Sequence, residues 1–76
     1  MTIPDDKLNR FIHTAYNVWF NKWKHKIRNM SDNDWECCIS ECVSMIKQGE
    51  QYPVVLDICK ALLGELEERF KENDQG

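Results

Sequence analysis

The sequence predicts an all-α protein, an up-down-up three-helix bundle built from a single domain of residues 1–76. Three observations lead to this prediction. Apolar residues recur at helical spacing in three segments, at about residues 5–28, 32–48 and 53–71. Glycine and proline are scarce, with three and two residues respectively, so little interrupts these segments. The links between the segments are short, and short links make sequential helices antiparallel neighbours.

The first helix, expected at about residues 5–28, has an unusually broad apolar surface. Asp5 and Asp6 suit its positive N-terminal end. Its main apolar stripe consists of Leu8, Ile12, Ala15, Trp19, Trp23 and Met30, with Phe11 and Val18 on one flank and Phe20 and Ile27 on the other. This surface is wider than the roughly 100° face that a helix normally buries against a core. The helix therefore needs neighbours on two sides, from its own chain or from another.

The second and third helices are ordinary one-faced amphipathic helices. Ser31 and Asp34 have the spacing of a capping box, with Asp in place of the usual Glu, and Gly49 supplies a C-terminal stop. Pro53 suits the first turn of the third helix, and we expect the polar tail 72–76 to fray. The expected buried faces are Trp35, Cys38, Ile39, Cys42, Val43 and Ile46 in the second helix, and Val55, Ile58, Cys59, Leu62, Leu63, Leu66 and Phe70 in the third.

Unequal helix lengths predict that the bundle is completed by dimerisation. At 1.5 Å per residue, the first helix would be roughly 36 Å long and the other two roughly 27 Å each. Part of the long first helix would then overhang, and its flanking residues would be exposed to water in a monomer. We therefore expect a homodimer, or a different protein partner, to cover the candidate interface residues Phe11, Val18, Phe20 and Ile27.

Four cysteines in a short chain raise the alternatives of a metal site, a disulfide or a redox role. Cys38 and Cys42 lie one helical turn apart on the buried face of the second helix, and Cys59 lies on the buried face of the third. Structural zinc sites use cysteine pairs two to four residues apart on a knuckle or turn, and none of these cysteines is so placed. We expect these three thiols to fill the core without a metal or any other cofactor, and Cys37 to be exposed to solvent.

The net charge of −3 is unevenly distributed: residues 1–30 carry six basic and two acidic side chains, and residues 31–76 carry four and eleven. The basic residues Lys22, Lys24, Lys26 and Arg28 alternate with aromatic residues, as in single-stranded nucleic-acid platforms. They are the candidate phosphate contacts of an alternative, nucleic-acid-associated function. The helix dipole favours the same distribution, and an isoelectric point of about 5.3 is low for a phosphate binder. Nucleic acid is therefore the less favoured partner.

The sequence contains no pattern typical of a catalytic site: it lacks a glycine-rich phosphate loop, a HExxH motif and a nucleophile elbow. It also lacks a membrane-spanning apolar stretch and the apolar core of a signal peptide. We therefore expect a cytoplasmic protein that is not an enzyme and has no small-molecule substrate. The favoured function is a small non-catalytic helical protein–protein interaction module, which either self-associates or modulates a larger partner.

Overall fold

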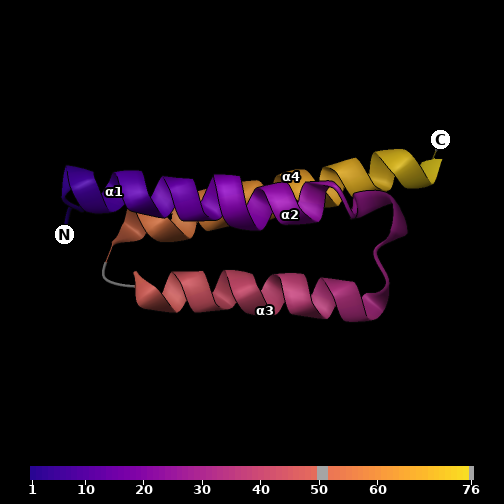
Figure 1. Ribbon diagram of the computed structural model, residues 1–76, viewed down its shortest axis with the longest axis horizontal. Coiled ribbons are helices and arrows are strands. Elements are labelled where there is room, and N and C mark those ends of the chain that lie inside the picture. The colour runs from indigo at the N-terminus through magenta and orange to yellow at the C-terminus, as the bar shows by residue number, and fades with distance from the viewer. Residues whose placement is uncertain (50–51, 76) are drawn as a thin grey trace.

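A computed structural model describes residues 1–49 and 52–75, and all of the regular structure in these residues is helical, as predicted. The first helical segment consists of α1 (Asp5–Ile12), η1 (His13–Phe20) and α2 (Asn21–Lys24), which follow one another without a break; we refer to residues 5–24 as helix one. A short 3₁₀ turn, η2 (Ile27–Asn29), leads to α3 (Asp32–Gln48), and α4 (Pro53–Gln75) completes the chain. In Figure 1, α3 runs back along helix one and α4 returns beside it.

Both ends of α3 and the start of α4 lie at the predicted residues. The hydroxyl of Ser31 accepts a hydrogen bond from the Asp34 N–H at 3.2 Å, and the Asp34 carboxylate accepts one from the Ser31 N–H at 3.1 Å. This is the capping box predicted from the sequence. The helix ends with Gly49 as its C-cap, and α4 begins at Pro53. Residues 50 and 51 of the expected link lie outside the described residues.

The core lies where the three helical segments meet. Its buried members are Ala15, Trp19, Phe20, Trp23, Ile27, Met30, Cys38, Cys42, Val55, Cys59 and Leu66. The Trp19 indole N–H donates a hydrogen bond to the Cys38 carbonyl at 3.2 Å, which joins helix one to α3. The rings of Trp35 and Phe70 meet edge to face at a centroid distance of 5.4 Å, which joins α3 to α4. Helix one contacts both α3 and α4, so its two neighbours come from its own chain.

The middle of helix one is a π-helix, and this changes which residues face the core. A π-helix closes its hydrogen bonds over five residues instead of four, as the Asn21 N–H does with the Tyr16 carbonyl. Each residue therefore turns by less than the roughly 100° of an α-helix. As a result, Phe11 packs against the core whereas Ile12 is 45% exposed. The prediction that Ile12 belongs to the buried stripe is wrong for this reason.

The longest helix is α4, with 23 residues, and not helix one. Helix one gives way to a turn at His25 and Lys26, whereas α4 extends to Gln75 and projects beyond the other helices at its C-terminal end (Figure 1). The helix α4 therefore continues past the expected end at residue 71, whereas at the opposite end of the molecule the start of helix one projects beyond α3 and α4 (Figure 1). Ion pairs on successive turns favour the longer helix, because Glu65 lies 2.8 Å from Arg69 and Glu68 lies 3.9 Å from Lys71. Gly76 lies outside the described residues.

Candidate functional site

The four side chains predicted to form an interface have different environments in the structure. Phe20 and Ile27 are buried in the core of their own chain, so the prediction that they form an exposed flank is wrong. Phe20 faces α4, where the Arg69 guanidinium lies 5.1 Å from its ring centroid. Phe11 is partly buried against the core. Val18 is 57% exposed, so of this set it alone presents most of its surface to solvent.

Two other residues of helix one form an exposed apolar strip. Ile12 and Tyr16 are one helical turn apart and are 45% and 47% exposed. The Tyr16 ring stacks on Phe20 at a centroid distance of 5.4 Å and an interplanar angle of 14°. The Lys24 ammonium lies 5.8 Å from the centroid of the Tyr16 ring. The sequence analysis did not predict this strip, because it assigned Ile12 to the core. The separation of four residues between Ile12 and Tyr16 does place them on the same face of a helix.

A second pair of apolar residues is exposed on α3. Ile39 and Val43 were expected on the buried face, but both are exposed. The buried line of α3 is instead narrow and runs through Cys38 and Cys42. The second helix therefore buries less of its apolar surface than the sequence pattern indicates.

The basic end of helix one is tied to α3 through Glu41. The Lys22 ammonium lies 2.7 Å from Glu41 Oε2, and the Trp23 indole N–H donates a hydrogen bond to Glu41 Oε1 at 2.9 Å. The ammonium groups of Lys22 and Lys26 lie 4.8 and 5.0 Å from the centroid of the Trp23 ring. Burial by itself would raise the pKa of Glu41, but hydrogen bonds from Lys22 and Trp23 and the positive charges of Lys22 and Lys26 lower it overall.

This arrangement gives the candidate phosphate contacts different surroundings. Lys22 is paired with Glu41, Lys24 and Lys26 lie over aromatic rings, and Arg28 is exposed in η2. A single-strand platform needs aromatic faces that bases can reach. Trp23 is buried and its ring faces two lysines of its own chain, so it does not offer such a face.

The cysteines have the predicted distribution, with three thiols in the core and Cys37 exposed. Burial raises the pKa of both Cys38 and Cys59 to about 12, and burial also raises the pKa of Cys42. The Cys42 thiol donates a weak hydrogen bond to the Cys59 carbonyl at 4.0 Å. These thiols are therefore protonated at neutral pH and are poor nucleophiles. Within residues 1–49 and 52–75, no three His, Cys, Asp or Glu side chains are grouped closely enough to hold a metal ion.

Comparison of the chain with protein-family models, curated proteins and solved structures finds no match. Across the described part of the chain, no helix combines the length and apolar character needed to cross a membrane. The features that bear on function are therefore those of the chain itself: the exposed strip of helix one, the basic end joined to Glu41, and the protonated thiols of the core.

Proposed function

We propose that this protein is a cytoplasmic, non-catalytic helical interaction module that self-associates through helix one. The exposed strip formed by Ile12 and Tyr16 is the observation that carries this proposal. Apolar surface rimmed by polar residues is typical of protein–protein contact sites, and tyrosine is enriched in the centre of such contacts. Helix one is the segment for which the sequence predicts association, although Val18 is the only predicted interface residue that is mainly exposed and it lies outside the strip.

The charges on either side of the strip favour a second copy of the chain as the partner. Asp5 precedes Ile12 by seven residues and so lies on the same helix face, and Lys24 reaches back over Tyr16. A two-fold axis through the strip would make the two copies of helix one antiparallel. The acidic end of each helix would then lie opposite the basic end of the other, with Asp5 close to Lys24 of the second copy. The expected dimer thus has an apolar centre and a complementary charge pair at each end.

Sedimentation velocity over a range of protein concentrations tests this proposal. We expect a species of twice the 9.1 kDa chain mass, which Ile12→Glu converts to monomer. Val18→Glu is the matched control, because it places the same charge at an exposed apolar position of helix one outside the strip. A wild-type chain that remains monomeric at about 100 µM would contradict self-association. Dissociation by Val18→Glu with no effect of Ile12→Glu would contradict the choice of surface.

A charge exchange tests the antiparallel arrangement separately. Asp5→Lys and Lys24→Glu should each weaken the dimer, because each places like charges opposite one another. The double variant restores opposite charges and should recover most of the affinity. Additive weakening in the double variant would show that these ends do not meet. Circular dichroism of each variant checks that the fold is retained.

Nucleic-acid binding through Lys22, Lys24, Lys26 and Arg28 is the alternative function, and the concentration of positive charge at this end of helix one favours it. The ion pair between Lys22 and Glu41 reduces the charge available there. Fluorescence anisotropy with labelled single-stranded and duplex DNA distinguishes the two functions. Phosphate binding predicts an affinity that falls steeply with salt and is lost on charge reversal of Lys24 and Arg28. If DNA binds with submicromolar affinity in about 150 mM salt, and the binding requires Lys24 and Arg28, nucleic-acid binding and not self-association would be the function.

A further inference from the structure

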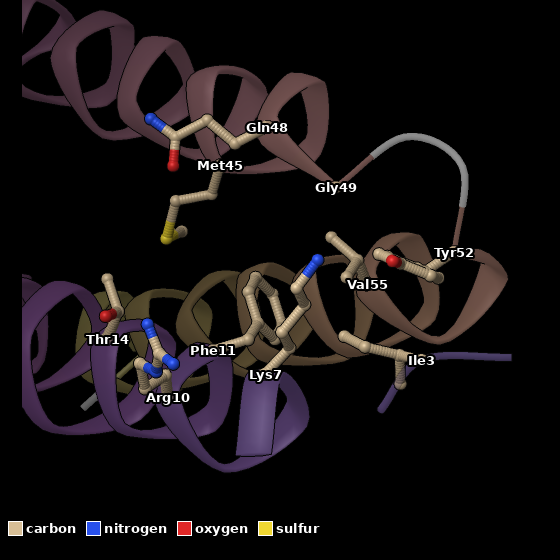
Figure 2. Close-up of a pocket in the computed structure, with 10 residues that line it drawn as sticks. All are labelled: Ile3, Lys7, Arg10, Phe11, Thr14, Met45, Gln48, Gly49, Tyr52 and Val55. Atoms are coloured by element: carbon tan, nitrogen blue, oxygen red, sulfur yellow. The ribbon is translucent and has the colours of Figure 1, made fainter. Parts of the chain in front are cut away.

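A cavity of about 410 Å³ opens between helix one, the C-terminal end of α3 and the start of α4 (Figure 2). Its volume falls within the range of about 300–1,000 Å³ that is typical of small-molecule sites. Neither the self-association strip nor the basic end of helix one contributes to its wall. The cavity is therefore a second feature of the molecule, independent of the proposed function.

Two opposite walls of the cavity are apolar. Phe11 of α1 forms one side, Met45 of α3 lies across from it, and Val55 of α4, which is only 1% exposed, adds little surface. Figure 2 shows the sulfur of Met45 directed into the space between α3 and helix one, toward the side on which Phe11 lies. Methionine is flexible and polarizable, so it adapts its shape to different apolar groups. These walls suit a compact apolar body such as a short alkyl chain or a phenyl ring.

Positive charge lines the rim of the same cavity. Lys7 and Arg10 are three residues apart on α1, and both contribute to the lining. In Figure 2 the Lys7 side chain passes over Phe11 toward Val55. Arg10 lies 3.5 Å from Asp6, but both side chains are largely exposed, so this pair is weak and leaves the guanidinium able to bind another anion. Among the described residues, the lining includes these two cations and no carboxylate.

Polar groups that can donate hydrogen bonds complete the lining. Thr14, Gln48 and Tyr52, whose side chains carry hydrogen-bond donors, are also lining residues. Apolar walls with a small number of convergent polar groups are the usual composition of a site that orients a small ligand. A guanidinium and an ammonium at the rim select a negatively charged group, because charge-assisted hydrogen bonds to a carboxylate are the strongest available to them.

We propose that this cavity binds a small organic acid, with the carboxylate between Lys7 and Arg10 and a compact apolar body against Phe11 and Met45. Arg10 donates to the carboxylate through its planar guanidinium, and Lys7 supplies a second positive charge from the opposite part of the rim. Lys7 and Arg10 precede Ile12 by five and two residues, so they lie on other faces of α1. Ligand binding and self-association through the strip are therefore compatible.

A titration followed by two-dimensional ¹⁵N–¹H NMR tests the proposal with a matched pair of probes. The probe 3-phenylpropionate carries the carboxylate, and 3-phenylpropanamide has nearly the same shape without the charge. We expect saturable shifts at Thr14, Gln48 and Val55 with the acid, and an affinity at least about tenfold lower for the amide. Equal affinities for acid and amide would overturn the proposal, as would the absence of saturable shifts at about 10 mM acid.

Three lysine and arginine variants identify the site. Lys7→Met and Arg10→Met keep a long apolar stem but remove the charge, so each should weaken binding of the acid by about tenfold. Lys60→Met is the control, because Lys60 is an exposed lysine of α4 that does not line the cavity. All three positions are exposed, and the fold should be retained in each case. Equal weakening by Lys60→Met would indicate non-specific attraction and contradict the site.

A third probe tests whether the ligand is a free organic acid or the C-terminus of a polypeptide, because both carry a carboxylate. An acetylated tripeptide ending in phenylalanine presents a carboxylate beside an aromatic ring, together with two further residues. The volume of the cavity matches a compact ligand, so we expect the tripeptide to bind no more tightly than 3-phenylpropionate. A tripeptide affinity more than tenfold higher than that of the free acid would assign the cavity to a protein C-terminus and overturn the proposed ligand class.

Discussion

Glu41 is the residue whose replacement should most clearly weaken the contact between helix one and α3. Its carboxylate accepts hydrogen bonds from Trp23, which is only 3% exposed, and from Lys22. Glu41→Ala leaves the buried indole N–H without an acceptor, which costs about 1–3 kcal/mol. The ion pair with Lys22 is partly exposed and contributes at most about 1 kcal/mol. We therefore expect Glu41→Ala to lower the free energy of unfolding by about 2 kcal/mol.

Two further variants separate the hydrogen bond from the ion pair. Glu41→Gln keeps a carbonyl oxygen that can accept from Trp23 but removes the charge, so it should cost less than about 1 kcal/mol. Lys22→Met removes the positive partner of the same ion pair and should also lower the free energy of unfolding by less than about 1 kcal/mol. Combining Lys22→Met with Glu41→Gln should add little to either single change, because both remove the same ion pair.

Urea unfolding followed by tryptophan fluorescence measures these differences. A domain of this size has a total stability of roughly 4–11 kcal/mol, so a loss of about 2 kcal/mol shifts the midpoint clearly. The slope of the transition should not change, because no large surface is newly exposed. Equal losses for Glu41→Ala and Glu41→Gln would refute the importance of the hydrogen bond to Trp23. A loss below about 0.5 kcal/mol for Glu41→Ala would refute the reasoning altogether.

The pH dependence provides a second readout for Glu41. Its pKa in the folded protein is lower than the usual value of 4.5, so the unfolded chain binds the proton more readily. The stabilisation is therefore present above about pH 4.5 and is lost as the pH falls through the folded-state pKa. Glu41→Gln cannot titrate and should lose less stability on acidification than the wild-type chain. Parallel acid profiles for the two proteins would contradict the lowered pKa.

Local geometry also determines the expected effects of two glycine substitutions, one cap substitution and two tests of the cysteines. Gly64→Ala should raise the free energy of unfolding by up to about 1 kcal/mol, because alanine favours helix and an added Cβ would meet nothing within 4 Å. Gly49→Ala should instead lower it, because the same atom would lie 2.8 Å from Val55 Cγ2. Ser31→Ala removes the capping box and should cost about 1 kcal/mol in the same urea assay. A thiol reagent should modify Cys37 rapidly and the three buried thiols only after unfolding. Burial raises the pKa of Cys38 and Cys59, so these thiols lose their protons at lower pH in the unfolded chain than in the folded protein. The free energy of unfolding should therefore be unaffected by these thiols below about pH 9.0 and should fall as the pH rises above that value.

The local features of the fold could be predicted from the sequence because short-range chemistry determines them. Ser31 and Asp34 cap α3 with groups three residues apart, and Pro53 starts α4 because its missing N–H is tolerated in a first turn. The burial of Cys38, Cys42 and Cys59 and the exposure of Cys37 followed from the phases of two amphipathic helices, α3 and α4. In each case, the residues that decide the outcome are close together in the sequence.

The orientation of helix one could not be predicted in the same way, because it depends on contacts between segments. The Trp19 indole N–H donates a hydrogen bond to a carbonyl of α3, whereas the ring of its neighbour Phe20 faces Arg69 of α4. Consecutive residues of an α-helix point about 100° apart, and the π-helical geometry reduces that angle so that both rings are buried. The same adjustment turns Ile12 outward and leaves it beside Tyr16 on the surface. The exposed strip proposed for self-association is thus a consequence of burying Trp19 and Phe20 together. A helix drawn with uniform α-helical spacing places the surplus apolar surface on two flanks, Phe11 with Val18 and Phe20 with Ile27. The protein's own core already covers the second of these flanks.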